Sequence, residues 1–166
     1  MSRLNSFIRR VTAQRDCLDA AARLIADLPG PALELGLGNG RTFDHLREIL
    51  PGREIFVFDR QVAAHPDCIP DDAHLLLGDF HDTVPTALVR IGAPAALAHC
   101  DIGSGDRDAT AQLAAWLGPV LVPLLADGAV VVGDQPLDDP SLTPLPLPDG
   151  VAPGRYHMSR HTGAPA

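Results

Sequence analysis

Three glycines at alternate positions, Gly36, Gly38 and Gly40, form the part of this sequence best suited to binding a ligand. A short apolar stretch precedes them and ends at Glu34, and residues 41–50 follow with apolar side chains at helical spacing. Glycine has no Cβ atom, so the backbone can turn sharply and lie directly against a bound molecule. The helix that follows would direct free N–H groups and the positive end of its dipole to the same place. The pattern therefore predicts a strand, a glycine turn and a helix that together bind a nucleotide-like ligand.

Acidic or polar residues also follow four later apolar runs that are typical of buried β-strands. The runs cover residues 54–58, 74–79, 95–100 and 128–133. The second run ends in Gly78-Asp79 and is followed by Phe80, and the others are followed by Asp59-Arg60, Asp101 and Asp134-Gln135. The carboxyl ends of parallel strands form the edge of an open α/β sheet where ligands bind. A carboxylate about 20 residues beyond a glycine motif suits hydrogen bonding to two ribose hydroxyls, so Asp59 is the candidate for that role. Each of these residues alone could instead cap a helix or form a turn.

The spacing Glu34-x-Gly36-x-Gly38-x-Gly40 resembles motif I of the Rossmann-like (class I) S-adenosylmethionine (SAM) dependent methyltransferases. A dinucleotide fingerprint has its third glycine one residue later, which disfavours the alternative of a nicotinamide-dependent oxidoreductase. The resemblance covers residues 32–135 and implies SAM as the cofactor. In that family the acidic residue at the start of the motif helps to hold the amino acid end of SAM, and an acidic residue after the third strand contacts the adenine amino group. The residues to which the resemblance assigns cofactor binding are Glu34, Gly36, Gly38, Asn39, Gly40, Thr42, Asp59, Arg60, Gly78, Asp79, Phe80 and Asp101.

The predicted fold class is α/β, a doubly wound, mostly parallel methyltransferase sheet between two helical layers with a reduced C-terminal strand pair. One domain over residues 1–166 is expected, with one or two N-terminal helices in residues 1–29, a SAM-binding core in 31–135 and a proline-rich tail in 136–166. Two further helices are predicted at residues 81–91 and 106–126, and the second crossover helix, near residues 67–72, is expected to be short or absent. In the longer helix we expect Pro119 and Pro123 to introduce a kink or a break and Asp127-Gly128 to end it. In the tail, residues 143–147 and 155–160 are the candidates for strands six and seven.

Composition narrows the function classes. The chain of 166 residues has a net charge of −8, which disfavours nucleic-acid binding because phosphate contacts need clustered basic residues. All thirteen basic residues are arginine, and the absence of lysine excludes a Walker-type phosphate loop and a pyridoxal phosphate Schiff base. The apolar stretches are too short to span a bilayer, and the first residues lack the features of a signal peptide. Three cysteines without metal-type spacing indicate reduced thiols in a cytoplasmic protein.

The reaction predicted from the resemblance is methyl transfer from SAM to a small-molecule acceptor. Asp101 is the candidate base, with His99 or His157 as its helper, and each histidine has a structural role as the alternative. A non-catalytic SAM-binding or interaction protein is the alternative from another function class. The amphipathic N-terminal segment and the tail lead us to expect a homodimer.

A magnesium ion is a less favoured hypothesis. Asp101, Asp134 and Gln135 are similar to the metal ligands of catechol O-methyltransferase type enzymes, although that type has Asn where this chain has Gln135. Oxygen ligands of this kind suit Mg²⁺. The favoured alternative is that the two aspartates cap loops or contact the substrate directly.

Overall fold

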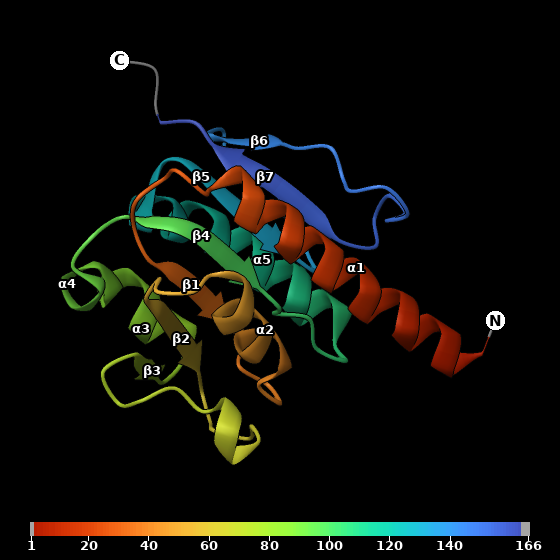
Figure 1. Cartoon of the computed structure of the whole chain (residues 1–166), viewed down its shortest axis with the longest axis horizontal. Helices are drawn as coiled ribbons and strands as arrows, with labels where there is room; N and C mark the ends of the chain where they lie inside the picture. The colour runs from red at the N-terminus through yellow and green to blue at the C-terminus, as the bar shows by residue number, and fades with distance from the viewer. Residues whose placement is uncertain (1, 164–166) are drawn as a thin grey trace.

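Seven strands form one sheet in the computed structural model, which describes residues 2–163 (Figure 1). The sheet order is β3-β2-β1-β4-β5-β7-β6, and strands β1 to β5 run parallel to one another. Strand β7 runs antiparallel to both β5 and β6. The strand bounds are β1 (Ala32–Leu35), β2 (Ile55–Asp59), β3 (Leu75–Leu77), β4 (Ala95–Cys100), β5 (Leu125–Gly133), β6 (Leu142–Pro144) and β7 (His157–His161). This arrangement confirms the predicted fold class.

Helices cover both faces of the sheet, and the sheet divides the apolar core into two layers. On one face, α1 (Arg3–Leu24) and α2 (Arg41–Ile49) pack on residues such as Leu97 and Val132. On the other face lie α3 (Phe80–Thr83), α4 (Ala87–Ile91) and α5 (Arg107–Leu121). Short 3₁₀ turns stand at η1 (Pro66–Cys68), η2 (Val84–Thr86) and η3 (Val122–Leu124). The η1 turn replaces the second crossover helix, as the prolines around it predict. Between Ser2 and Gly163 no helix is both long and apolar enough to cross a membrane.

The N-terminal segment is one continuous helix. The Ser2 side chain caps α1 by accepting a hydrogen bond from the Asn5 N–H, which satisfies one of the free donors of the first turn. The C-terminal half of α1 packs on the sheet through a buried stripe that includes Cys17, Leu18 and Ala21. Its first turns extend beyond the sheet (Figure 1).

The prediction of a single helix over residues 81–91 is wrong, because the structure divides this stretch into shorter elements. The structure has α3, then η2, then α4 over this stretch. Pro85 lies inside η2, and because proline has no backbone N–H it cannot continue the α-helical hydrogen bonds there. The helix also begins earlier than predicted, because Asp79 caps α3 by accepting from the His81 N–H.

The predicted helix over residues 106–126 is too long at its C-terminal end. Helix α5 continues through Pro119 to Leu121, and strand β5 already begins at Leu125. Asp127-Gly128 therefore lies inside the strand instead of ending the helix. The pairing between β4 and β5 shifts register between Ala95 and Leu97, and this irregularity accommodates the extra residues in β5.

The predicted antiparallel strand pair of the tail exists, but its bounds differ from the prediction. Strand β6 ends at Pro144, three residues before the predicted end, because the prolines that follow remove ladder donors. Strand β7 begins at His157 and continues to His161, so Arg155 and Tyr156 precede it. Tyr156 therefore lies in the turn that leads into β7, and its side chain is fully buried there.

Candidate functional site

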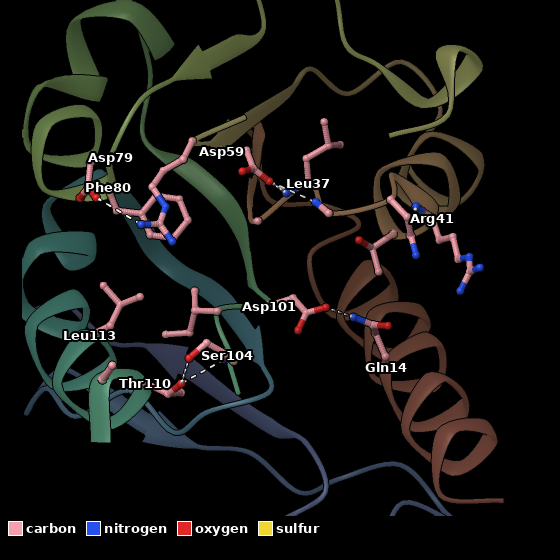
Figure 2. Close-up of a pocket in the computed structure, with 18 of the residues that line it drawn as sticks. Gln14, Leu37, Arg41, Asp59, Asp79, Phe80, Asp101, Ser104, Thr110 and Leu113 are labelled. Carbon is pink, nitrogen blue, oxygen red and sulfur yellow. Dashed lines mark hydrogen bonds and ion pairs between the residues drawn. The ribbon is translucent and has the colours of Figure 1, made fainter. Parts of the chain in front are cut away.

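A cavity of about 610 Å³ opens at the carboxyl ends of β1, β2 and β4 (Figure 2). Strands β1 and β4 are neighbours in the sheet although they are not consecutive, so the chain leaves them in opposite directions and opens a crevice there. The cavity is lined from four sides: α1, the glycine turn, the ends of β2 and β3, and the segment from Asp101 into α5. Its size is in the range of small-molecule sites.

The three glycines of the turn are needed for different physical reasons. A Cβ atom on Gly36 would collide with the carbonyl oxygen of Asp101, and one on Gly40 would lie 2.5 Å from the Cβ of Cys68. Both glycines are therefore required by the packing of the protein itself. A Cβ atom on Gly38 would meet no atom within 4 Å, and the residue lines the cavity with φ at +51°. Gly38 alone of the three therefore leaves room for a ligand.

Asp59 closes the glycine turn from the end of β2. Its Oδ2 atom accepts hydrogen bonds from the N–H groups of Leu37, at 2.9 Å, and Gly38, at 3.1 Å. Its Oδ1 atom accepts from the Gln61 N–H at 3.1 Å. Figure 2 shows the carboxylate beside the Leu37 backbone at the edge of the cavity. One carboxylate thus joins the motif to the second strand and remains accessible from the cavity.

Asp79 and Phe80 form the far side of the cavity with Arg60. The Asp79 carboxylate accepts from the backbone N–H of His81 and contacts its imidazole, and its other oxygen lies 4.0 Å from the Arg60 guanidinium. The backbone hydrogen bond from His81, followed by the contact with its side chain, lowers the pKa of Asp79. This carboxylate is therefore ionised at neutral pH and can accept hydrogen bonds.

Asp101 follows β4 and faces the cavity opposite Asp79. Its Oδ2 atom accepts from the Gln14 side-chain amide at 3.1 Å and lies 3.8 Å from the Arg10 guanidinium. Figure 2 shows Gln14 reaching from α1 toward this carboxylate. The N-terminal helix and the end of the fourth strand therefore meet in the site.

Several predicted site residues do not line the cavity. Gly40 and Gly78 are not among its lining residues, and neither is His157 of β7. Glu34 and His99 are fully buried and contact each other, with Glu34 Oε2 2.6 Å from His99 Nδ1. The second Glu34 oxygen accepts from the Thr42 hydroxyl. Both oxygens of Glu34 therefore already have partners inside the protein.

Burial and the neighbouring carboxylate act on the pKa of His99 in opposite directions. Burial favours the neutral imidazole, whereas the charge of Glu34 and its hydrogen bond favour the protonated form. The two effects of Glu34, together with the negative charges of Asp101 and Asp134, outweigh burial and raise the pKa of His99. Burial also raises the pKa of the adjacent Cys100 thiol and of the Tyr156 hydroxyl.

The two aspartates among the proposed magnesium ligands already have other partners in the structure. Asp134 Oδ1 accepts from the Ile102 N–H at 3.0 Å, and its Oδ2 accepts from the Gln135 side-chain amide at 3.2 Å. Asp101 is directed toward Gln14 and Arg10. Within the described part of the chain, no three histidine, cysteine or acidic side chains are grouped so that they could hold a metal ion. Asp134 instead fixes the loop that follows β4, which is the loop-capping alternative.

The cavity includes residues that the sequence did not single out as site residues. Arg10, Val11 and Gln14 come from α1, Arg41 begins α2, and Ile102, Gly103, Ser104, Ala109, Thr110 and Leu113 come from the β4–α5 segment. One of them had a signal in the sequence. Gln14 interrupts the apolar stripe Val11, Leu18 and Ala21 on the buried face of α1, where a polar side chain needs a partner.

Known proteins resemble this chain in sequence and in fold. Residues 1–161 match the model of a family described as S-adenosyl-L-methionine methyltransferase. The crystal structure of an S-adenosyl-L-methionine methyl transferase from Silicibacter pomeroyi DSS-3 is 45% identical, with a TM-score of 0.91 over 97% of this chain and 99% of that chain. No curated protein matches the chain.

Two more distant structures share the fold. Cofactor-bound Rv0187 from MTB is 17% identical, with a TM-score of 0.55 over 95% of this chain and 88% of that chain. The plantazolicin methyltransferase BpumL, in complex with a pentazolic desmethylPZN analog and SAH, is 15% identical, with a TM-score of 0.52 over 74% of this chain and 46% of that chain. At these identities the likeness concerns the fold alone.

Proposed function

Because the chain belongs to the S-adenosyl-L-methionine methyltransferase family, we propose that it transfers the methyl group of SAM to a small-molecule acceptor bound in the cavity described above. The observation that carries this proposal is the order of groups along the cavity. Asp101, the glycine turn at Leu37, Asp59 and then Asp79 with Phe80 line the cavity, and Figure 2 shows them in this order around its wall. This order matches the ammonium, ribose and adenine parts of one extended cofactor.

Each group of the wall has a chemical role toward the cofactor. Asp59, at the end of β2, accepts hydrogen bonds from the two ribose hydroxyls. Asp79 accepts from the adenine amino group, and the Phe80 ring offers an apolar surface to the base. The backbone at Gly38 lies against the sulfur and ribose part, because no side chain occupies that space. SAM supplies an already activated methyl group, so the protein mainly positions the reactants and excludes water.

Asp101 is the better candidate for the cofactor's ammonium group, although the resemblance assigns the amino acid end to Glu34. Both Glu34 oxygens are taken by Thr42 and His99, and the residue is fully buried. The Asp101 side chain is 29% exposed and faces the cavity. A carboxylate that remains accessible can pair with an ammonium group without first losing internal hydrogen bonds.

The remaining part of the wall is the acceptor side. It is formed by Arg10 and Val11 of α1, by Ser104, and by Thr110 and Leu113 of α5. One cation, two hydroxyls and small apolar side chains suit a small molecule that carries an anionic or hydroxyl group. We therefore propose carboxylated and hydroxylated compounds as the first acceptors to test.

The experiment for this function measures both binding and turnover. In calorimetric titrations we expect SAM and S-adenosylhomocysteine to bind and NAD to give no comparable heat. With a panel of carboxylated and hydroxylated acceptors, mass spectrometry is expected to find a methylated product together with S-adenosylhomocysteine. Preferential binding of NAD would contradict the proposed cofactor site. SAM binding without turnover on any acceptor would favour the non-catalytic alternative.

We expect a homodimer formed through the first turns of α1. Leu4, Phe7 and Ile8 are 66%, 43% and 48% exposed and lie on one stripe of the helix where it extends beyond the sheet. Burying such a stripe against a second copy would remove it from water. Light scattering is expected to give twice the 17.5 kDa mass of the chain, and Phe7→Asp with Ile8→Asp is expected to give one chain mass.

A matched control for the dimer is Val89→Asp on α4. Val89 is 94% exposed and lies on α4, on the opposite side of the molecule from the first turns of α1 (Figure 1), so its replacement is expected to leave the mass unchanged. A wild-type protein that scatters as a single chain at high micromolar concentration would contradict the dimer. A Val89→Asp variant that dissociates would instead place the contact on α4.

A further inference from the structure

A chain of buried hydrogen bonds runs from the centre of the sheet to the cavity. Glu34 of β1 and His99 of β4 are register partners in adjacent strands, and both side chains are fully buried. His99 Nδ1 lies 2.6 Å from the Glu34 carboxylate, and His99 Nε2 lies 2.6 Å from the Tyr156 hydroxyl oxygen. Charged and polar groups at this depth are costly to bury unless each of them has a partner.

Gln14 continues this chain to the cavity wall. Its side-chain amide nitrogen lies 3.1 Å from the Tyr156 hydroxyl oxygen and 3.1 Å from Asp101 Oδ2. Gln14 is itself buried, with 7% of its surface exposed, and the cavity end of the chain is the Asp101 carboxylate. The full sequence of contacts is therefore Glu34, His99, Tyr156, Gln14 and Asp101.

The direction of the contacts near the cavity follows from the Asp101 carboxylate. An ionised carboxylate only accepts hydrogen bonds, so Gln14 must present its amide nitrogen and not its oxygen to Asp101. The same nitrogen contacts Tyr156, whose oxygen therefore accepts from Gln14. A neutral His99 with its proton on Nδ1 accepts the Tyr156 proton at Nε2, and a protonated His99 donates to the Tyr156 oxygen. In both forms of His99 the Tyr156 oxygen remains an acceptor for Gln14.

The chain joins parts of the protein that are far apart in the sequence. Gln14 and Tyr156 are separated by 142 residues and come from α1 and from the turn before β7. The Arg10 guanidinium also lies near Asp101, but its side chain is 45% exposed and its distance of 3.8 Å is long for an ion pair. The buried amide of Gln14 is therefore the group that fixes where the carboxylate points.

We propose that Gln14 and Tyr156 are positioning residues that hold the Asp101 carboxylate toward the ammonium group of SAM, with the buried Glu34–His99 pair as their anchor. This inference rests on the proposed function, because it requires SAM in the cavity with its amino acid end at Asp101. It assigns a role in the site to the N-terminal helix and to the tail, which the glycine motif alone does not involve. It also gives the buried acidic residue of the motif an indirect role in place of direct contact with the cofactor.

The test uses Tyr156→Phe and Gln14→Met, which remove the hydrogen-bonding groups and keep most of the side-chain volume. The loss of one hydrogen bond that orients Asp101 is expected to weaken SAM binding by roughly three- to tenfold in each variant. The double variant is expected to bind about as weakly as either single one, because both act through the same contact. In an Asp101→Asn background, Tyr156→Phe is expected to change SAM binding no further.

A second ligand separates positioning from general destabilisation. 5′-Methylthioadenosine has the adenosine part of SAM but no amino acid end, so both variants are expected to bind it as the wild type does. His161→Leu is the matched control, because His161 is a buried histidine on β7 whose Nδ1 contacts the Ala126 carbonyl away from the cavity. That variant is expected to lose stability without losing SAM affinity.

The outcomes distinguish the inference from the function on which it rests. A wild-type protein that does not bind SAM would contradict the proposed function. Wild-type SAM affinity in a folded Gln14→Met or Tyr156→Phe variant would overturn the positioning role alone. An equal loss of SAM and methylthioadenosine binding would also overturn it, because the effect would then not be confined to the amino acid end. If Tyr156→Phe does not fold, Gln14→Met at the cavity wall still decides the question.

Discussion

Gly38→Val is expected to abolish SAM binding while the protein remains folded. The residue lines the cavity, and its Cβ position has no atom within 4 Å, so the new side chain projects into the space that the cofactor needs. The two neighbouring glycines cannot provide this test, since side chains at Gly36 or Gly40 collide with the protein's own atoms. Calorimetric titration with SAM, together with a thermal melt of the variant, measures the two parts of the prediction.

Gly52→Val is the matched control for this substitution. Gly52 also has a positive φ, +80°, and open space at its Cβ position, but it lies in the turn between α2 and β2, outside this cavity. Both variants therefore carry the strain of a left-handed L-residue, roughly 1–2 kcal/mol. Only Gly38→Val is expected to lose SAM binding. A folded Gly38→Val protein that binds SAM normally would show that the cofactor does not lie against the glycine turn.

The positions of the parallel strands could be predicted from the sequence because each of these strands is apolar and has a polar residue at or after its end. Strand β4 is the clearest example, since all six residues from Ala95 to Cys100 are buried and the predicted bounds are those of the structure. The junction of α5 and β5 could not be predicted. The apolar side chains of the helix continue without a break into Leu124 and Leu125, and the register shift beside Ala95 is a property of the neighbouring strand.

The candidate site could be predicted where its residues are close in sequence to a strand end. Asp59, Asp79 and Asp101 all line the cavity, as their places after β2, β3 and β4 indicated. Which residues of α1 enter the site could not be predicted, because nothing in one sequence states which strand end a long helix crosses. Gln14 and Tyr156 are 142 residues apart, and their contact exists only in the folded chain.

Glu34 shows how a motif can predict a position without its contacts. The sequence places an acidic residue before the glycine turn, and the resemblance assigns it to the amino acid end of SAM. The structure pairs it with His99 in the adjacent strand, at the same register position, and with the Thr42 hydroxyl at the start of α2. Charged residues inside two otherwise apolar strands were the available signal, since buried charges need partners. The pairing itself depends on the order of strands β1 and β4.

Asp59→Ala is expected to weaken SAM binding by roughly 1.5–3 kcal/mol, which corresponds to about ten- to a hundredfold in affinity. The substitution removes the acceptors for the ribose hydroxyls. It also removes the acceptor for the Leu37 and Gly38 N–H groups, so the glycine turn loses the contact that joins it to β2. Both losses act on the same ligand surface, which is why we expect a larger effect than from Tyr156→Phe or Gln14→Met. Titration calorimetry with SAM measures this change.

Asp139→Ala controls for the loss of an aspartate that stabilises a turn. Asp139 Oδ1 accepts from the backbone N–H and the hydroxyl of Ser141, and the residue lies outside the cavity. Its removal is expected to lower the melting temperature and leave the SAM affinity unchanged.

Asp59→Asn separates the two roles of Asp59 further, because the amide has one acceptor oxygen and places a donor where a carboxylate oxygen stood. We expect it to bind SAM more weakly than the wild type, since the amide donor faces either the Gln61 N–H or the N–H groups of the glycine turn. Unchanged affinity in a folded Asp59→Ala protein would remove the ribose contact from β2 and require the cofactor to cross the sheet edge elsewhere.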